Sequence, residues 1–175
     1  PDMPTSATFG RRRPEFQYMQ GLRGVFLGLG LTEVNTLTLS NEQEQFANMG
    51  ISEIPEDHVS ILNPISKDHT CLRVSLMPSL FNILRANKHR ELPQMVFEIG
   101  DVVPTGRNEI RASALIIDAK ASFTQIKSLA EAVLHEMYLV YDLKSKDVPP
   151  YIPGRSAVII ANGLEIGDFG EVHPS

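Results

Sequence analysis

The sequence is poor in several features that would indicate a particular class of protein. It contains a single cysteine, Cys71, and no tryptophan. One thiol cannot form an internal disulfide, so we expect a reducing compartment and predict a cytoplasmic protein. No apolar run approaches the roughly 20 residues of a membrane-spanning helix, and the first residues do not have the pattern of a signal peptide. We therefore expect neither a disulfide-built secreted domain nor a membrane protein.

Positively charged residues are also fewer than negatively charged ones. The chain has 16 Lys and Arg residues against 21 Asp and Glu residues, which gives a formal net charge of −5. A surface dominated by phosphate contacts needs concentrated Lys and Arg, so the composition argues against a dominant nucleic-acid-binding surface. Two local basic clusters remain, at Arg11–Arg13 and at Arg85–Arg90.

The residues that most often carry chemistry form no clear site. The 5 histidines are scattered and lack metal-ligand spacing, so we predict no metal site. Cys71 has neither a partner cysteine nor an evident base nearby, and we predict a structural thiol. Gly28–Leu31 lies at a predicted helix end and lacks the Lys-Ser/Thr of a phosphate-binding loop. We assign no catalytic, cofactor-binding or metal-binding residue in this chain.

Three charged residues stand out by their surroundings. Arg73 and Glu98 are set among apolar residues, where they form either a structural ion pair, a contact to a partner, or a ligand site. Arg155 lies in Pro-Gly-Arg-Ser-Ala, a predicted tight turn that leads into a strand. Its guanidinium either holds a carboxylate or phosphate through a bidentate contact or braces the turn.

The order of elements predicts an α+β protein. Residues 1–13 have no period and are interpreted as a linker, and residues 14–175 as a single domain. Strands come as hairpins rather than in strict alternation with helices, which favours a mainly antiparallel sheet flanked by about three helices. The chain begins without Met and ends just after a strand-like stretch, as expected of a fragment of a longer protein.

Local signals place several of these elements. Asn162-Gly163 accepts positive φ angles and is predicted to join two strands in a hairpin. Ser122 with Gln125 forms a capping box at the start of a helix. A strand is predicted at 95–103. The strand at 111–118 is apolar on both faces and is predicted to be central in its sheet.

The first predicted helix starts at Pro14 and has an unusual glycine content. Apolar residues at helical spacing, Phe16, Met19 and Phe26 among them, form one face. Each glycine in a helix interior costs roughly 1 kcal/mol relative to alanine. The three glycines at Gly21, Gly24 and Gly28 therefore indicate either a close approach by another backbone or a loosely formed helix.

Four segments in order resemble the beta subunits of phenylalanyl-tRNA synthetases, in the archaeal and eukaryotic form. They are NPISKDHTCLRVSLMPSLFNILRANKHRELPQMVFEIGDVV, SFTQIKSLAEAVL, PGRSAVI and IGDFGEVHP. The resemblance covers about residues 14–174. It implies a catalytic-like module with the antiparallel class II synthetase fold. It also implies an ATP- and Mg-dependent enzyme that attaches phenylalanine to tRNA, and a heterotetramer with a catalytic alpha subunit.

The resemblance implies a non-catalytic role for this module. Class II enzymes hold ATP with arginines in a Phe-Arg-x-Glu motif and in a later glycine-rich motif. Here Arg107-x-Glu109 lacks the aromatic residue, and the later motif does not occur. The first helix stands where class II proteins build their dimers. The resulting expected contacts to the alpha subunit are Phe16, Met19, Gly21, Gly24, Phe26 and Gly28.

Two other functions stay open at this point. One is a tRNA-contacting module that uses Arg11–Arg13 and the Arg85–Arg90 cluster. The other is a stand-alone enzyme that binds a small acid through Arg155.

Overall fold

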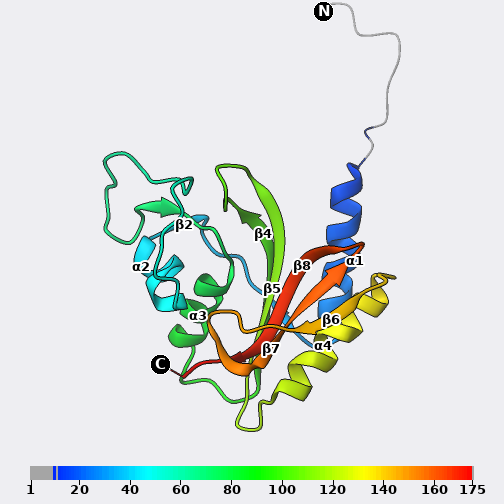
Figure 1. The fold of residues 1–175 in the computed structure, drawn as a ribbon. Helices are drawn as coiled ribbons and strands as arrows, with labels where there is room; N and C mark the ends of the chain where they lie inside the picture. Colours follow the sequence, from blue (N-terminus) through cyan, green and yellow to red (C-terminus); the bar gives the residue numbers. More distant parts are fainter. Residues whose placement is uncertain (1–9, 11, 175) are drawn as a thin grey trace, which may run out of the picture.

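A computed structural model describes Gly10 and residues 12–174. In chain order the elements are α1 (Pro14–Gly28), β1 (Thr32–Glu33), β2 (Leu39–Ser40), α2 (Glu42–Gln45), the 3-10 helix η1 (Ala47–Met49), β3 (Cys71–Leu72), α3 (Met77–Ala86), β4 (Gln94–Val102), β5 (Glu109–Ile117), α4 (Phe123–Glu136), β6 (Asp142–Ser145), β7 (Tyr151–Ala161) and β8 (Leu164–Val172) (Figure 1). The division into a linker and a single domain stays a prediction.

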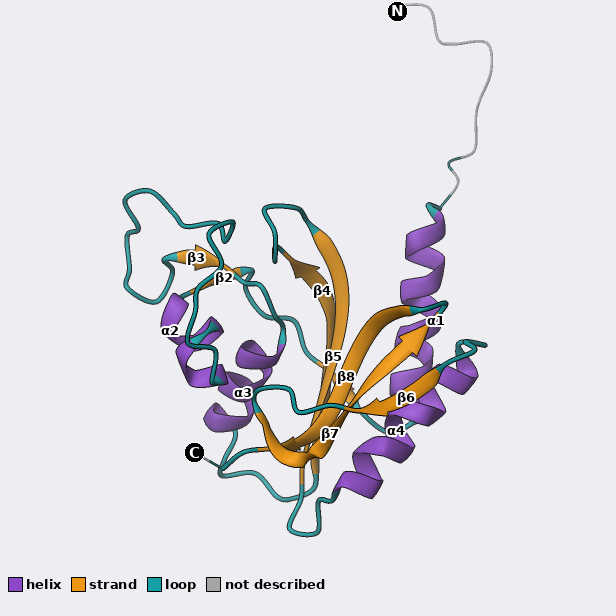
Figure 2. Ribbon diagram, in the orientation of Figure 1, coloured by secondary structure: helices purple, strands orange, loops and turns teal. Residues whose placement is uncertain are grey.

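The strands of the described residues form three small sheets instead of the single sheet that we predicted (Figure 2). Their orders are β1-β4-β5, β2-β3 and β6-β7-β8. All pairs are antiparallel except β1 and β4, so the expected α+β class and mainly antiparallel pairing hold. The described residues contain four α-helices, of which α2 has only 4 residues, close to the expected three.

Strand β4 is the centre of the core because helices cover both of its faces. In Figure 1, α1 and α4 lie on one side of β4 and β5, and α3 lies on the other. Phe97 and Phe26 of α1 stack with their ring centroids 4.7 Å apart. Val96, which points to the opposite face, packs with Leu80 of α3 and Leu115 of β5. Successive side chains of a strand alternate between its two faces, so the side chains on both faces of β4 are buried.

The local predictions for the start of α1, the cap of α4 and the turn at Asn162-Gly163 are confirmed. Pro14 is the first residue of α1, and Gly30 follows the helix with φ of 86°. Ser122 accepts a hydrogen bond from the Gln125 N–H and caps α4. Asn162 and Gly163 have φ of 51° and 77° between β7 and β8. These features depend on backbone preferences of one or two residues, which sequence specifies directly.

The predicted central position of the strand at 111–118 is wrong. Strand β5 lies at the edge of its sheet, and Ile110 and Ile117 are 46% and 43% exposed. The apolar run of β5 is explained by the packing of Leu115 beneath α3, and not by neighbouring strands on both edges of β5. No helix in the described part of the chain is long and apolar enough to cross a membrane.

Candidate functional site

Arg73 and Glu98 form a buried ion pair between the segment after β3 and the middle of β4. Their side chains are only 2% and 1% exposed, and Arg73 Nη1 donates to Glu98 Oε1 over 2.9 Å. Thr36 joins them: its hydroxyl donates to Glu98 Oε2 over 2.6 Å and accepts from Arg73 Nη1 over 2.7 Å. The Thr36 N–H also donates to Glu98 Oε1. Each charge therefore has charged and neutral partners within the chain.

The space for the Arg73 guanidinium depends on Gly100. A Cβ at Gly100 would lie 2.6 Å from Nη2 of Arg73 and 3.2 Å from Oε1 of Glu98. Arg73 Nε donates to the carbonyl oxygen of Asp101 over 2.8 Å. A charge held this closely in the core has little capacity for a ligand, so the geometry favours the structural interpretation of Arg73 and Glu98.

The residues around the β4–β5 hairpin do not fit a nucleotide site. Arg107 is exposed at the tip, next to Gly106 with φ of 68°. Glu109 is paired with Arg111 at 2.7 Å, and Asn108 donates to the carboxylate of Asp101 over 2.7 Å. Phosphate binding needs converging cations, whereas this tip carries carboxylates whose partners lie within the hairpin.

Arg155 lies in an irregular section inside β7, not in a turn that precedes a strand. The register of β7 against β8 shifts between Tyr151 and Ser156. Arg155 Nη1 donates to the carboxylate of Glu171 on β8, which also accepts from the Phe123 N–H at the start of α4 over 2.5 Å. The hydrogen bond from Arg155 lowers the pKa of Glu171 from its ordinary value, against the opposing effect of burial. This partner favours a bracing role over ligand binding.

Cys71 is fully buried. Burial raises the pKa of its thiol, and the nearby carboxylate of Glu42 raises it further. A raised pKa disfavours the nucleophilic thiolate. The geometry therefore agrees with a structural thiol.

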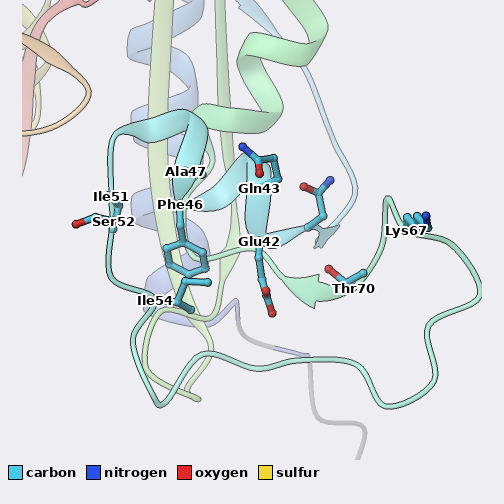
Figure 3. Close-up of a pocket in the computed structure, with 10 residues that line it drawn as sticks. Glu42, Gln43, Phe46, Ala47, Ile51, Ser52, Ile54, Lys67 and Thr70 are labelled. Atoms are coloured by element: carbon cyan, nitrogen blue, oxygen red, sulfur yellow. The ribbon is translucent and has the colours of Figure 1, made fainter.

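Beside β3 lies an open hollow of about 410 Å³ (Figure 3). It is lined by Asn41, Glu42, Gln43, Phe46, Ala47, Ile51, Ser52, Ile54, Lys67 and Thr70. The Glu42 carboxylate oxygen lies 3.0 Å from Nε2 of His58, whose Nδ1 lies 2.9 Å from the Pro55 carbonyl. These contacts hold the long loop before β3 in place. Among the described residues, no group of three His, Cys, Asp or Glu side chains is arranged to hold a metal ion.

Helix α1 presents its glycines to solvent. Gly21, Gly24 and Gly28 are exposed, and a Cβ added at any of them would meet no atom within 4 Å. Within the described residues, therefore, no backbone makes the close approach that their pattern suggested. A close approach by backbone occurs elsewhere, at Gly170, where a Cβ would lie 2.6 Å from the Arg155 carbonyl oxygen.

The structure divides the residues expected at an interface. Phe26 is 6% exposed and belongs to the core, so its assignment to a surface is wrong. Met19 is half-buried and packs against the same cluster. Phe16 is 52% exposed, and sequence reasoning missed Tyr18 and Leu27, which are 70% and 52% exposed. Helical spacing identified the apolar positions but did not separate those that face the core from those that face solvent.

The expected basic clusters are exposed where the structure describes them. Arg12 and Arg13 precede α1, whereas Arg11 lies outside the described residues, as do residues 1–9 of the predicted linker. Arg85, Lys88, His89 and Arg90 are all exposed at and after the end of α3.

Comparisons with known proteins identify relatives of the whole chain. The family model for the phenylalanyl tRNA synthetase beta chain CLM domain matches residues 1–175. A phenylalanine–tRNA ligase beta subunit of Archaeoglobus fulgidus is 41% identical over 175 residues, covering 99% of this chain and 32% of the relative. A beta subunit of Methanococcus maripaludis strain C5 is 36% identical over 182 residues, covering 98% of this chain and 33% of the relative. The chain thus spans about a third of the length of these relatives.

A solved structure shows the same fold. The match is to a pyrrolysyl tRNA synthetase of Desulfitobacterium hafniense, with a TM-score of 0.65 and 19% sequence identity. It covers 88% of this chain and 57% of that one. At this identity the likeness concerns the fold alone, which is that of this synthetase.

Proposed function

This chain belongs to the phenylalanyl-tRNA synthetase beta chain family, and from that premise we propose that it is a non-catalytic module of a phenylalanine–tRNA ligase. Its role is to pack against a catalytic alpha subunit and to help assemble the enzyme that attaches phenylalanine to tRNA. The ATP- and Mg-dependent chemistry is assigned to the alpha subunit. The expected heterotetramer and the cytoplasmic location are part of the same proposal.

The glycine stripe of α1 carries this proposal. Consecutive residues of an α-helix are about 100° apart around the axis, which places Gly21, Gly24 and Gly28 about 140–160° from Phe26. Phe26 faces the core, so the glycines point away from it. Arg23 fixes this orientation, because its Nε donates to both carboxylate oxygens of Glu33 over 2.7 and 2.8 Å.

The three glycines of α1 weaken the helix unless another contact compensates for them. In a helix interior each glycine costs roughly 1 kcal/mol relative to alanine. Nothing in the described chain approaches the open positions at Gly21 and Gly24. Because the glycines have no side chains, a second helix or strand can pack directly on this stripe with its backbone close to α1. The exposed aromatic rings of Phe16 and Tyr18 border the stripe and supply apolar contact area.

The non-catalytic part of the proposal is supported by the charges. Arg73 and Glu98 are engaged with each other in the core, and Arg155 is engaged with Glu171. The hairpin tip at Arg107 does not fit a nucleotide. These arginines leave no converging set for the ATP phosphates, which agrees with chemistry on another subunit.

Co-purification with the alpha subunit tests the assembly role. We expect the wild-type chain to form a complex at micromolar concentration and Gly24→Leu to weaken it at least tenfold, because the branched side chain fills the stripe. Ser128→Leu, at an exposed position of α4, is the matched control and is expected to leave assembly unchanged. Separate elution of the wild-type chain and the alpha subunit would refute the proposal.

An ATP–pyrophosphate exchange assay with phenylalanine tests the non-catalytic role. The chain without the alpha subunit is expected to give no exchange above a protein-free blank. Exchange that depends on phenylalanine and disappears in Arg107→Ala would show that the hairpin tip does bind ATP.

A further inference from the structure

The connection between α3 and β4 carries a compact group of cations that the proposed assembly role does not use. Arg85, Lys88, His89 and Arg90, here called the basic turn, are all exposed. None of them forms an ion pair with any residue that the structure describes. In Figure 1, α3 and this connection lie on the side of the molecule away from α1. A partner on the basic turn and a partner on α1 therefore need not compete.

Side-chain hydrogen bonds hold the basic turn in one shape. Asn87 donates from Nδ2 to the Ile83 carbonyl over 2.8 Å and accepts from Nε of Arg90 over 3.0 Å. From the other side, Nε2 of Gln94 donates to the carbonyl oxygens of Asn87 and Arg90 over 3.1 and 3.4 Å. A surface that is already ordered loses little conformational entropy when it binds.

These bonds leave the charged groups free. Arg90 uses only its Nε in the turn, so the four N–H groups of its two terminal nitrogens remain available as a planar fork. Such a fork matches the geometry of a phosphate. Arg85 and Lys88 add two further cations on the same short stretch.

Stabilisation of α3 does not explain the whole group. Cations favour the negative end of a helix, but the effect falls off within the last turn. Only Arg85 lies in the last turn of α3. Lys88, His89 and Arg90 follow the last helical residue, Ala86.

The chemistry around the basic turn favours a polyanion over a protein partner. Protein interfaces have an apolar core, whereas nucleic-acid interfaces are more polar and more positive. The neighbours here are Asn87 and Gln94, and Leu92 is the only large aliphatic residue from 85 to 94 that is markedly exposed. Glu91 is the only carboxylate in that stretch. Cations are thus concentrated locally in a chain whose formal net charge is −5.

We propose that the basic turn is a docking surface for the phosphate backbone of RNA, and that it contacts tRNA in the assembled ligase. This inference rests on the proposed function, which supplies tRNA as the substrate of the whole enzyme. The contact is to phosphates and not to bases, because backbone contacts by Arg and Lys position an RNA without reading its sequence.

The test measures tRNA binding by the complete ligase, assembled with its alpha subunit, over a range of salt concentrations. The variant is Arg85→Gln with Lys88→Gln, which leaves the Arg90–Asn87 bond of the turn intact. Each lost phosphate contact lowers the slope of log K against log salt by about 0.7–0.9. We expect the slope to fall by about 1.5 and tRNA binding in low salt to weaken by about tenfold.

Arg111→Gln is the matched control. Arg111 is 51% exposed but is paired with Glu109, so its loss should leave the salt slope unchanged. An unchanged slope in the double variant overturns the inference and leaves the assembly role standing. Weaker binding of the alpha subunit, with tRNA binding unchanged, also overturns it, because the basic turn would then be a protein contact. A wild-type complex that does not form or does not charge tRNA refutes the proposed function instead.

Discussion

Replacing Gly21 and Gly24 with alanine should stabilise the free chain and weaken the assembled enzyme. Both positions lie inside α1, neither has a positive φ, and a Cβ at either would meet no atom within 4 Å. Alanine is therefore accommodated without strain. Each replacement removes a cost of roughly 1 kcal/mol in helix propensity. The double variant should gain about 2 kcal/mol, which raises Tm by about 4–8 °C for a domain of this size.

The same two methyl groups occupy the stripe that we assign to the alpha subunit. If another backbone packs directly on it, the methyl groups separate the two surfaces, and well-packed interfaces tolerate added volume poorly, at about 1–3 kcal/mol. The affinity for the alpha subunit should fall by about tenfold or more. The opposite signs of the two effects distinguish an interface from a general loss of stability.

Thermal unfolding of the free chain and calorimetric titration with the alpha subunit measure the two effects. Ser128→Ala on α4 is the control, since it improves helix propensity by about 0.5 kcal/mol at an exposed position away from the stripe. A lower Tm of the double variant would show that the glycines are needed within the chain itself. A higher Tm with unchanged affinity would show that the stripe is not the contact.

Three further outcomes follow from the charges. Glu98→Ala leaves the Arg73 charge buried and unpaired, so it should lower the free energy of unfolding by about 3–5 kcal/mol in a denaturant melt. Replacing both residues, with Arg73→Met and Glu98→Leu, should lower it much less. Equal losses of stability in the two variants would contradict the ion pair. Gly100→Ala should destabilise the chain because the added methyl group displaces the Arg73 guanidinium. Gly163→Asn, at a turn, is the control and should be tolerated. An unchanged unfolding curve for Gly100→Ala would exclude the close contact. The pKa of Glu171 is lowered in the folded chain, so its contribution is present above the ordinary value of 4.5 and is lost as pH falls below it. Glu171→Gln should flatten the acid side of a stability–pH curve, and an unaltered curve would refute this linkage.

The elements that sequence predicted well depend on short-range rules. The start of α1 at Pro14, the cap at Ser122 and the Asn162-Gly163 turn each follow from the backbone preferences of one or two residues. The longer predictions failed where distant residues decide. The apolar run at 111–118 predicts a central strand, but β5 lies at the edge of its sheet, where Leu115 packs with Leu80 of α3.

The candidate site shows the same division. Helical spacing selected Phe16, Met19 and Phe26 as one apolar face, but the direction of the core turned Phe26 inward against Phe97 and left Phe16 exposed. The glycine pattern signalled a surface without side chains. Only the packing showed that nothing in the described chain covers it.

The sequence by itself determined the family, the α+β class, the cap of α4, the turn at Asn162-Gly163, and the presence of charges among apolar residues. These depend on residue order and on local conformational preference, which the chain carries before it folds. The tertiary structure decided which charges meet and which faces stay open. Arg73 and Glu98 are 25 residues apart in sequence, and their pairing exists only because β4 places Gly100 beside the guanidinium. Such contacts depend on the relative positions of distant segments, and packing of the whole core fixes those positions.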